Sequence, residues 1–371
     1  MSPNSFRRGP LSLLSLQGWR DLVSDSMAID IGSTSVIIAV LGRGVVVDEP
    51  AVVAVNKISG EAVAVGREAH EMLGRESRDV SLVYPLVDGV VADFERTQKM
   101  LDQFVRRARS GISHFSRRAV MSVLSGITQV EQRALLAAAE SAHIGRVYMV
   151  EEGLAAAIGA GVSVEDKNAS AVVDIGGGTT NVAVVARGMI VYAQAERVGS
   201  IDIDEAIINR LRRHHGLIIG APTAEALKKE LGSAVEPQNP ARSLSVKGRD
   251  VQTGAPRAVD VSSGEVCLAT EGVVQRIARV VNRALGELQP EVASDLYDRG
   301  IILTGGGALL GGMAERLQKD LRLHVAVADD PLAAVAQGAG RLLTDKARLH
   351  RVAIREDVPV WEAEQALVVN W

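Results

Sequence analysis

The sequence predicts an α/β protein of two similar domains with mostly parallel sheets, and length, composition and an internal repeat support this. The 371 residues suit two domains of ordinary size better than one compact core. Hydrophobic residues make up 47% of the chain and aromatic residues only 3%, so Val, Ile, Leu and Ala must form the core. Such a composition is typical of parallel strands that are buried on both faces.

The repeat consists of an apolar strand, a glycine-rich turn and a second apolar strand. The first copy comprises Met27–Ile31 and Val36–Leu41, and the second comprises Ala171–Ile175 and Val182–Ala186. Each copy continues through a glycine turn into another strand. Two units of one design predict two similar domains that face each other.

Alternating helices and strands follow each copy, which favours α/β layers. Strands are expected at Val120–Leu124, Val147–Val150 and Ile301–Leu303, and helices at Thr97–Arg109, Gln129–Ala142, Glu152–Ala160, Asp204–Arg213, Thr223–Leu231 and Pro331–Leu343. The last helix is expected to have Asp330 as its cap and Pro331 at its first position. Residues 236–256 are expected to form a loop or a loop-bounded hairpin. We expect domains at 27–160 and 161–343, an extension at 1–26 and a tail at 344–371.

Charge and cysteine content exclude several classes of protein. The 41 basic and 45 acidic residues give a net charge of −4, so no nucleic-acid partner is expected. Cys267 is the only cysteine, which excludes an internal disulfide and a cysteine-based metal site and fits the cytoplasm. No apolar run is long enough to span a membrane, and no signal peptide is expected.

Three glycine-rich loops, each after a buried strand, predict phosphate binding. Glycine lets successive backbone N–H groups converge on phosphate oxygens, and nearby hydroxyls add donors. One such loop alone is more often an ordinary turn. Two matching loops and a third at a strand end favour a nucleotide site formed by Gly32-Ser33-Thr34-Ser35, Gly176-Gly177-Gly178-Thr179-Thr180 and Gly305-Gly306-Gly307.

Asp30 and Asp174 occupy matching positions just before the first two loops. A carboxylate there would repel phosphate unless a cation lay between them, and Mg²⁺ is often held by one or two carboxylates, water and phosphates. The alternative is that each aspartate bonds only to the N–H groups of its own turn. We expect the pair to hold Mg²⁺ through water.

Several segments together resemble the MreB family of bacterial actins over about Met27–Leu343. They are Asp30–Ser35, Glu49–Ala54, Met72–Arg75, Asp88–Phe94, Gly126–Ala134, Glu151–Gly161, Asp174–Val184, Asp204–Asn209 and Leu303–Leu310. The resemblance implies an actin-like ATPase fold, in which two ribonuclease-H-like domains, each with a small subdomain, hold ATP and Mg²⁺ in a central cleft.

The resemblance also implies roles for single residues. Phosphate would be held by Ser33, Thr34 and Ser35 on one side and by Gly177, Gly178 and Thr179 on the other. The ribose and adenine would contact Glu225, Ala226, Leu227 and Lys228. The adenosine would be covered by Gly306, Gly307, Ala308 and Leu309. Glu225 and Lys228 could instead form an exposed ion pair three residues apart.

Glu131 has two interpretations. In Thr128-Gln129-Val130-Glu131 it completes a capping box, which by itself explains the sequence. The resemblance implies that it orients the water that attacks the γ-phosphate.

Two segments suggest membrane contact. Residues 1–26 place Leu13, Leu16 and Trp19 on one broad side of a helix, as in an interfacial anchor, although a disordered tail is the alternative. Ile112 and Phe115 lie in the loop after the helix Thr97–Arg109, where some family members insert apolar residues, or Phe115 packs on its own domain.

The resemblance implies a cytoplasmic filament on the inner face of the cell membrane that organises cell-wall synthesis and rod shape with partner proteins. Its ATPase would be slow and coupled to polymerisation. The alternatives are a pseudo-ATPase scaffold that barely hydrolyses ATP and, less favoured, a small-molecule kinase. The scaffold is favoured by four departures from the family pattern around the cleft: Ser35, Leu124, Gly153 and Ile201.

Overall fold

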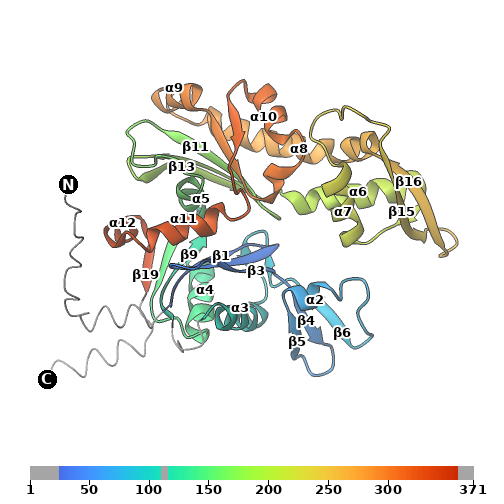
Figure 1. The fold of residues 1–371 in the computed structure, drawn as a ribbon, viewed down its shortest axis with the longest axis horizontal. Helices are drawn as coiled ribbons and strands as arrows, with labels where there is room; N and C mark the ends of the chain where they lie inside the picture. The colour runs from blue at the N-terminus through green and yellow to red at the C-terminus, as the bar shows by residue number, and fades with distance from the viewer. Residues whose placement is uncertain (1–24, 110–115, 358–371) are drawn as a thin grey trace, which may run out of the picture.

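The computed structural model describes residues 25–109 and 116–357, which form two halves, each centred on a mixed sheet (Figure 1). The predictions for Leu13, Leu16, Trp19, Ile112 and Phe115 lie outside the described residues. Within the described residues, no helix is both long enough and apolar enough to cross a membrane.

The two central sheets repeat one topology, which confirms the predicted duplication. In each, an antiparallel meander of three strands is joined by a parallel strand from later in the chain. The first sheet has the order β19-β10-β9-β1-β2-β3, from β1 (Asp25–Ile31), β2 (Ser35–Val40), β3 (Gly44–Pro50), β9 (Ser116–Val123), β10 (Val147–Glu151) and β19 (Arg355–Asp357). The second has the order β13-β12-β11-β17-β18, from β11 (Ser170–Ile175), β12 (Thr180–Ala186), β13 (Met189–Glu196), β17 (Ile301–Thr304) and β18 (Val325–Val327).

Amphipathic helices cover the outer face of each sheet and bury the two main cores. On the first sheet these are α3 (Phe94–Ala108) and α4 (Gln129–Ser141). The second core includes residues of α6 (Ser200–His215), α7 (Ala221–Leu231), α8 (Ser263–Gly286), α9 (Pro290–Arg299), the short η1 (Gly306–Leu309) and α10 (Met313–Leu321). The strands are rich in Val, Ile and Ala, which fits their burial between helical layers.

Two helices, α5 (Glu152–Gly159) and α11 (Ala334–Leu342), lie between the two sheets. Helix α11 contacts β1, β2 and β9 of the first sheet, and α5 contacts β11 and β12 of the second. They cross closely because glycines face the partner's backbone: a Cβ on Gly159 would lie 1.7 Å from the Ala334 oxygen, and one on Gly338 1.8 Å from the Ala155 oxygen. The third core is therefore shared by both halves.

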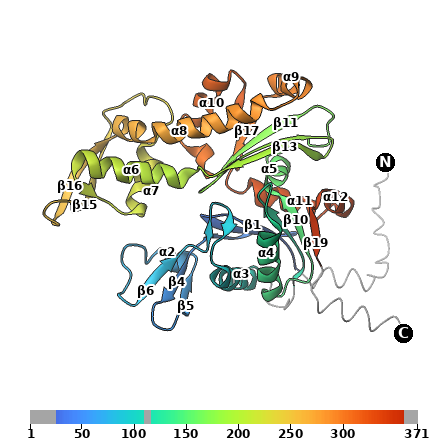
Figure 2. The same cartoon turned by 180° about the vertical axis from the view of Figure 1, so that it is seen from behind.

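Each half carries a smaller lobe beside its sheet (Figure 2). The first lobe contains β4 (Val53–Asn56), β5 (Ala62–Val65), α2 (Arg67–His70) and β6 (Val80–Val83), and the hairpin β7 (Leu86–Val87) and β8 (Val90–Val91) leads back to α3. The second lobe contains α6, α7, β14 (Leu217–Ile218), β15 (Ser243–Asp250) and β16 (Pro256–Ser262). The hairpin expected within 236–256 forms as β15–β16 and extends to Ser262.

The end of the described chain differs from the prediction. The expected helix over 331–343 begins at Ala334, so its predicted start at Pro331 is wrong. Asp330 Oδ1 does accept the Ala333 N–H, at 3.4 Å, but in the turn before the helix. Residues 330–333 form a turn instead, because the Pro331 carbonyl accepts the Gly305 N–H at 2.8 Å. Beyond 343, α12 (Lys346–Val352) follows and β19 pairs with β10, so this part of the chain joins the first half.

Candidate functional site

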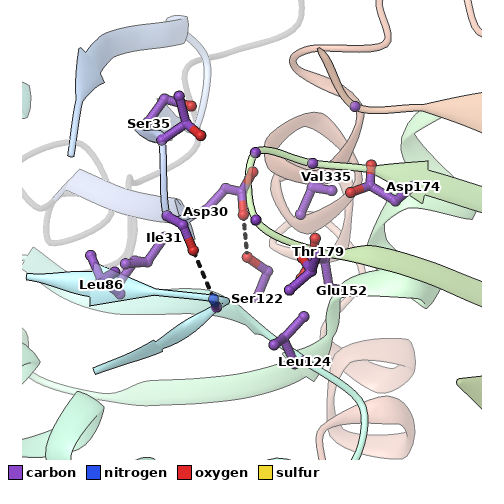
Figure 3. A pocket seen from close by; sticks show the side chains of 18 of the residues that line it. Asp30, Ile31, Ser35, Leu86, Ser122, Leu124, Glu152, Asp174, Thr179 and Val335 are labelled. Carbon is purple, nitrogen blue, oxygen red and sulfur yellow. Dashed lines mark hydrogen bonds between the residues drawn. The ribbon is translucent and has the colours of Figure 1, made fainter. Parts of the chain in front are cut away.

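A pocket between the halves gathers the ends of β1, β11 and β17 (Figure 3). These strands are inner strands of their sheets. The loops that follow their carboxyl ends therefore meet at the pocket. The pocket is lined by Asp30 near the end of β1 and Ser33, Thr34 and Ser35 after it, by Asp174 near the end of β11 and Gly177, Gly178 and Thr179 after it, and by Gly305 and Gly306 after β17.

The first two glycine loops have the same local geometry. The Gly32 N–H donates to the Ser35 carbonyl at 2.9 Å, and the Gly176 N–H donates to the Thr179 carbonyl at 2.8 Å. The loops also touch each other, since a Cβ on Gly177 would lie 1.6 Å from Thr34 Oγ1. Backbone N–H groups and hydroxyls thus meet from both sides, as a phosphate group requires.

Three carboxyl groups lie at the floor of the pocket. Asp30 accepts a hydrogen bond from the Ser122 hydroxyl at 2.7 Å (Figure 3). Asp174 accepts one from Thr304 Oγ1 at 2.7 Å. The third group is Glu152, the first residue of α5. Because these three acids lie close together and away from water, ionising all of them at once is energetically unfavourable.

Burial is the main cause of their altered acidity. It raises the pKa of Asp30 from 3.8 to about 7, and the charge of Asp174 adds to the effect. Burial, followed by the charges of Asp174 and Asp30, raises the pKa of Glu152 well above its usual value. Burial also raises the pKa of Asp174. The floor of the pocket therefore favours a bound cation or bound protons.

The donor set fits Mg²⁺ held largely through water. Among the described residues, no group of three or more His, Cys, Asp or Glu side chains is arranged to bind a metal ion directly. Mg²⁺ keeps several waters and is bound through one or two carboxylates plus phosphates, which Asp30, Asp174 and the two loops can provide. The hydroxyls of Ser122 and Thr304 orient these carboxylates, as outer-shell groups do.

The expected ribose and adenine residues are not gathered in the same way. Gly306 lines the pocket, Gly307 and Ala308 are buried beside it, and Leu309 is 56% exposed. None of the α7 residues Glu225, Ala226, Leu227 and Lys228 is among the residues that line it.

The alternative for Glu225 and Lys228, an ion pair with each other, does not form. Glu225 pairs with Lys229 at 2.7 Å, four residues on, and Lys228 pairs with Asp204 of α6 at 2.7 Å. The physical reason is that α7 packs on α6, which brings the Lys228 ammonium to a buried carboxylate.

Glu131 forms the predicted capping box at the start of α4. Its Oε2 accepts the Thr128 N–H at 2.8 Å and the Thr128 hydroxyl at 2.7 Å, while its own N–H donates to Thr128 Oγ1 at 3.3 Å. Its carboxylate is therefore satisfied by the cap, and Glu131 does not line the pocket. Glu152 does line it.

The sequence analysis missed Glu152 because it placed this residue only at the start of a helix. The signal was available: Glu152 directly follows β10, which ends at Glu151. That position is the carboxyl edge of a parallel strand, where ligands bind in open α/β sheets.

An apolar wall faces the carboxyl groups from the first half. It includes Leu86, Leu124, Ile127 and Leu135. Leu124, one of the departures from the family pattern, packs on the turn before β8: a Cβ on Gly89 would lie 2.2 Å from Leu124 Cδ1, and Gly89 has a φ of +76°. Gly89 also donates its N–H to Ser33 Oγ at 2.7 Å. The wall therefore excludes water from one side and helps to position the first loop.

Comparison with known proteins identifies the family. The sequence profile described as MreB/Mbl protein matches residues 24–351. The chain belongs to the MreB/Mbl family. The match covers the second sheet, the first sheet except its edge strand β19, both lobes and all three glycine loops, so the shared fold includes the whole pocket.

Members of the MreB/Mbl family from several bacteria resemble the chain over most of its length. The cell shape-determining protein MreB of Pasteurella multocida is 43% identical over 87% of this chain and 94% of its own length. The cell shape-determining protein Mbl of Bacillus subtilis is 39% identical over 87% of this chain and 97% of its own.

A solved structure confirms the actin-like fold. The crystal structure of MreB 5 of Spiroplasma citri bound to AMPPNP matches with a TM-score of 0.83 and 32% identity, over 89% of this chain and 98% of that one. The same protein has also been crystallised with ADP.

Proposed function

We propose that this chain is an actin-like protein that binds ATP with Mg²⁺ in the cleft and assembles with copies of itself into filaments. The observation that carries the proposal is the meeting of two glycine turns, each closed by the same backbone hydrogen bond, over buried carboxyl groups at the boundary between the halves. A nucleotide bound there contacts both halves at once, so its phosphates set how closely they approach. The MreB 5 structures with AMPPNP and ADP support nucleotide binding at this fold.

Within this proposal the phosphates lie between Ser33–Ser35 and Gly177–Thr179, and Mg²⁺ is held through water by Asp30 and Asp174. When bound, the ion would neutralise charge on the phosphates. Gly306, Gly307, Ala308 and Leu309 would lie on the nucleoside side, and Gly306 lines the pocket.

We assign the water-orienting role to Glu152 in preference to Glu131. Glu152 lies in the pocket beside Asp174, whereas the Glu131 carboxylate is engaged by its helix cap. A carboxyl group with a raised pKa tends to hold its own proton, so it can accept one from attacking water only when it is ionised. A bound cation would lower the pKa of Glu152 and so favour the ionised form. Hydrolysis would be slow until subunit contacts fix the cleft.

The cellular role follows from the relatives. They are named cell shape-determining proteins, which supports a filament that organises cell-wall synthesis and rod shape. We place the filament in the cytoplasm, peripherally on the inner face of the membrane, with cell-shape and cell-wall synthesis proteins as partners. The family match favours this function over a small-molecule kinase.

Electron microscopy and sedimentation of the full chain test the proposal. With Mg²⁺ and ATP we expect filaments that pellet, and fewer or none without nucleotide. A well-folded protein that shows no saturable binding of ATP with Mg²⁺ would refute the proposal.

A pseudo-ATPase scaffold is the second candidate, and the apolar Leu124 beside the carboxyl groups favours it. Phosphate release under polymerising conditions distinguishes the two. An ATPase loses phosphate release in Glu152→Ala and keeps most of it in Glu131→Ala. If the chain is a scaffold, the wild-type protein and both variants release phosphate at the same slow rate.

A further inference from the structure

Asn181 is a buried polar side chain without a hydrogen-bond partner. It is only 6% exposed, and neither its Nδ2 nor its Oδ1 forms a hydrogen bond with any residue in the described part of the chain. Buried amides in folded proteins are nearly always paired, because an unpaired polar group away from water costs free energy. An exception of this kind needs an explanation, and a role at a catalytic site is one of the usual ones.

Asn181 is the second residue of β12 and lies on the face of the second sheet that meets α5. In the register of β11 with β12 it is directly opposite Asp174, so the two side chains point to the same side of the sheet. Side chains alternate between the faces of a strand. Val182 and Val184 belong to the second core, so Asn181 and Ala183 lie on the other face.

Helix α5 brings Glu152 to this face. The residue after it, Gly153, packs so closely on β12 that a Cβ on Gly153 would lie 2.3 Å from the Ala183 Cβ. Ala183 is two residues beyond Asn181 on the same face of the strand. The first turn of α5 therefore runs along β12, with Glu152 at its pocket end beside Asn181.

The Asn181 amide is near enough to act on Glu152. Burial and the charges of the neighbouring aspartates raise the pKa of Glu152, and the Asn181 side chain opposes that rise. No hydrogen bond of ordinary length joins the two side chains. Hydrogen bonds to a catalytic base commonly tighten only in the complex with substrate. A small movement of the Glu152 carboxylate towards β12 would complete this one.

An amide suits this position better than a charged group. Another carboxylate would add to the repulsion among the acids at the floor of the pocket, and a lysine would pair with the aspartates that we expect to hold Mg²⁺. The amide donates hydrogen bonds without a net charge, so it can orient Glu152 and leave the aspartates to the cation. Asn181 itself is not among the residues that line the pocket, so it would act through Glu152 and not on the nucleotide.

We propose that Asn181 is a positioning residue that donates a hydrogen bond from Nδ2 to the Glu152 carboxylate and thereby fixes the orientation of Glu152 towards the attacking water. The inference rests on the proposed function, since it takes Glu152 as the group that orients this water. It separates two measurable quantities, because Asn181 acts on the rate of hydrolysis and not on the affinity for the nucleotide.

Phosphate release and nucleotide binding by the full chain test the inference. Asn181→Leu keeps the approximate size of the side chain and removes its polar atoms. With Mg²⁺ and ATP we expect phosphate release to fall about tenfold or more, as for loss of a hydrogen bond to a charged group, while the affinity for a fluorescent ATP analogue stays within about threefold of wild type. Sedimentation of the same samples measures the filaments, so that release is compared per pelleted protein.

The melting temperature distinguishes positioning from a structural role. Because the amide is buried and unpaired, Asn181→Leu should melt at or above the wild-type temperature. Val185→Ala is the matched control, since Val185 is buried on the same face of β12, four residues further from the pocket. It should lower the melting temperature and leave phosphate release per pelleted protein unchanged.

A double variant shows whether Asn181 acts through Glu152. Asn181→Leu combined with Glu152→Gln should release phosphate no more slowly than Glu152→Gln alone, because the two residues act as one unit. If Asn181→Leu does not fold, Asn181→Ala, which only removes atoms, should slow phosphate release in the same way.

Several outcomes would overturn the inference. They are wild-type phosphate release in the folded Asn181 variants, a loss of nucleotide affinity as large as the loss of rate, a melting temperature of Asn181→Leu below wild type, and a further loss of rate in the double variant. A wild-type protein that binds ATP but releases no phosphate would instead refute the role of Glu152, and this inference with it. One that binds no ATP would refute the proposed function as a whole.

Discussion

The crossing of α5 and α11 provides a matched pair of substitutions on one helix. Gly338 and Gly340 both lie in α11, but their surroundings differ. A Cβ on Gly338 would lie 1.8 Å from the Ala155 oxygen and 2.7 Å from the Ala155 carbonyl carbon, whereas a Cβ on Gly340 meets only the Ala28 Cβ, at 3.9 Å. The first must displace a backbone, and the second makes an ordinary contact.

The expected effects have opposite signs. Ala is favoured over Gly inside a helix by about 1 kcal/mol, so Gly340→Ala should stabilise the protein by up to that amount. Gly338→Ala has the same helix gain but forces overpacking that costs about 3 kcal/mol, which leaves a net loss of about 2 kcal/mol. At roughly 2–4 °C per kcal/mol, the two variants should melt about 6–12 °C apart.

Differential scanning calorimetry of the two variants and the wild type measures this difference. Equal melting temperatures for Gly338→Ala and Gly340→Ala would refute the close crossing. A third variant, Gly159→Ala, approaches the same contact from α5, where its Cβ would lie 1.7 Å from the Ala334 oxygen, and should destabilise like Gly338→Ala.

Three further predictions concern the site and its supports. Glu152→Gln should leave ATP affinity within a few-fold of wild type and lower phosphate release by about 10²-fold or more, as expected for loss of a positioned base; equal loss in Glu131→Gln would contradict this assignment. Because burial raises the pKa of Asp30 from 3.8 to about 7, its contribution to stability is complete below about pH 4 and is lost as the pH rises through 7. Asp30→Asn removes that loss, so without Mg²⁺ the variant should melt above the wild type at about pH 8, and a lower melting point would contradict the raised pKa. Thr128→Ala removes the α4 cap and should cost about 1 kcal/mol in urea unfolding, with nucleotide affinity unchanged; a large loss of affinity would place this helix start at the nucleotide.

The sequence could predict the features that depend on local pattern. The strands at β1, β2, β11 and β12 lie within two residues of their expected bounds, because each is an apolar run that ends at a glycine turn. The meeting of Asp30 with Asp174 follows from the repeat itself, since equivalent strands of equivalent sheets end at equivalent places.

The features that the sequence could not provide depend on contacts between distant segments. Glu152 enters the pocket only because β10 pairs with β9 beside β1, an order of strands that no local pattern encodes. Lys228 meets Asp204 because two helices pack, and the local rule of ion pairs along one helix pointed to Glu225 instead. The start of α11 is set by a hydrogen bond from Gly305, far earlier in the chain, which holds Pro331 in a turn.

The α5–α11 crossing also connects the arrangement of the halves to the chemistry of the cleft. Helix α5 begins with Glu152 in the pocket and ends at Gly159 in the crossing, about 10 Å along its axis. Helix α11 begins beside the pocket, where Val335 and the preceding Leu332 line it. Since the two helices touch backbone to backbone, a rotation of one half against the other must move Glu152 relative to the phosphate loops. Contacts between subunits of a filament that favour one angle between the halves would therefore also set the position of Glu152, the carboxylate to which we assign the water-orienting role. Under that proposal, assembly would control hydrolysis without any subunit reaching into the site.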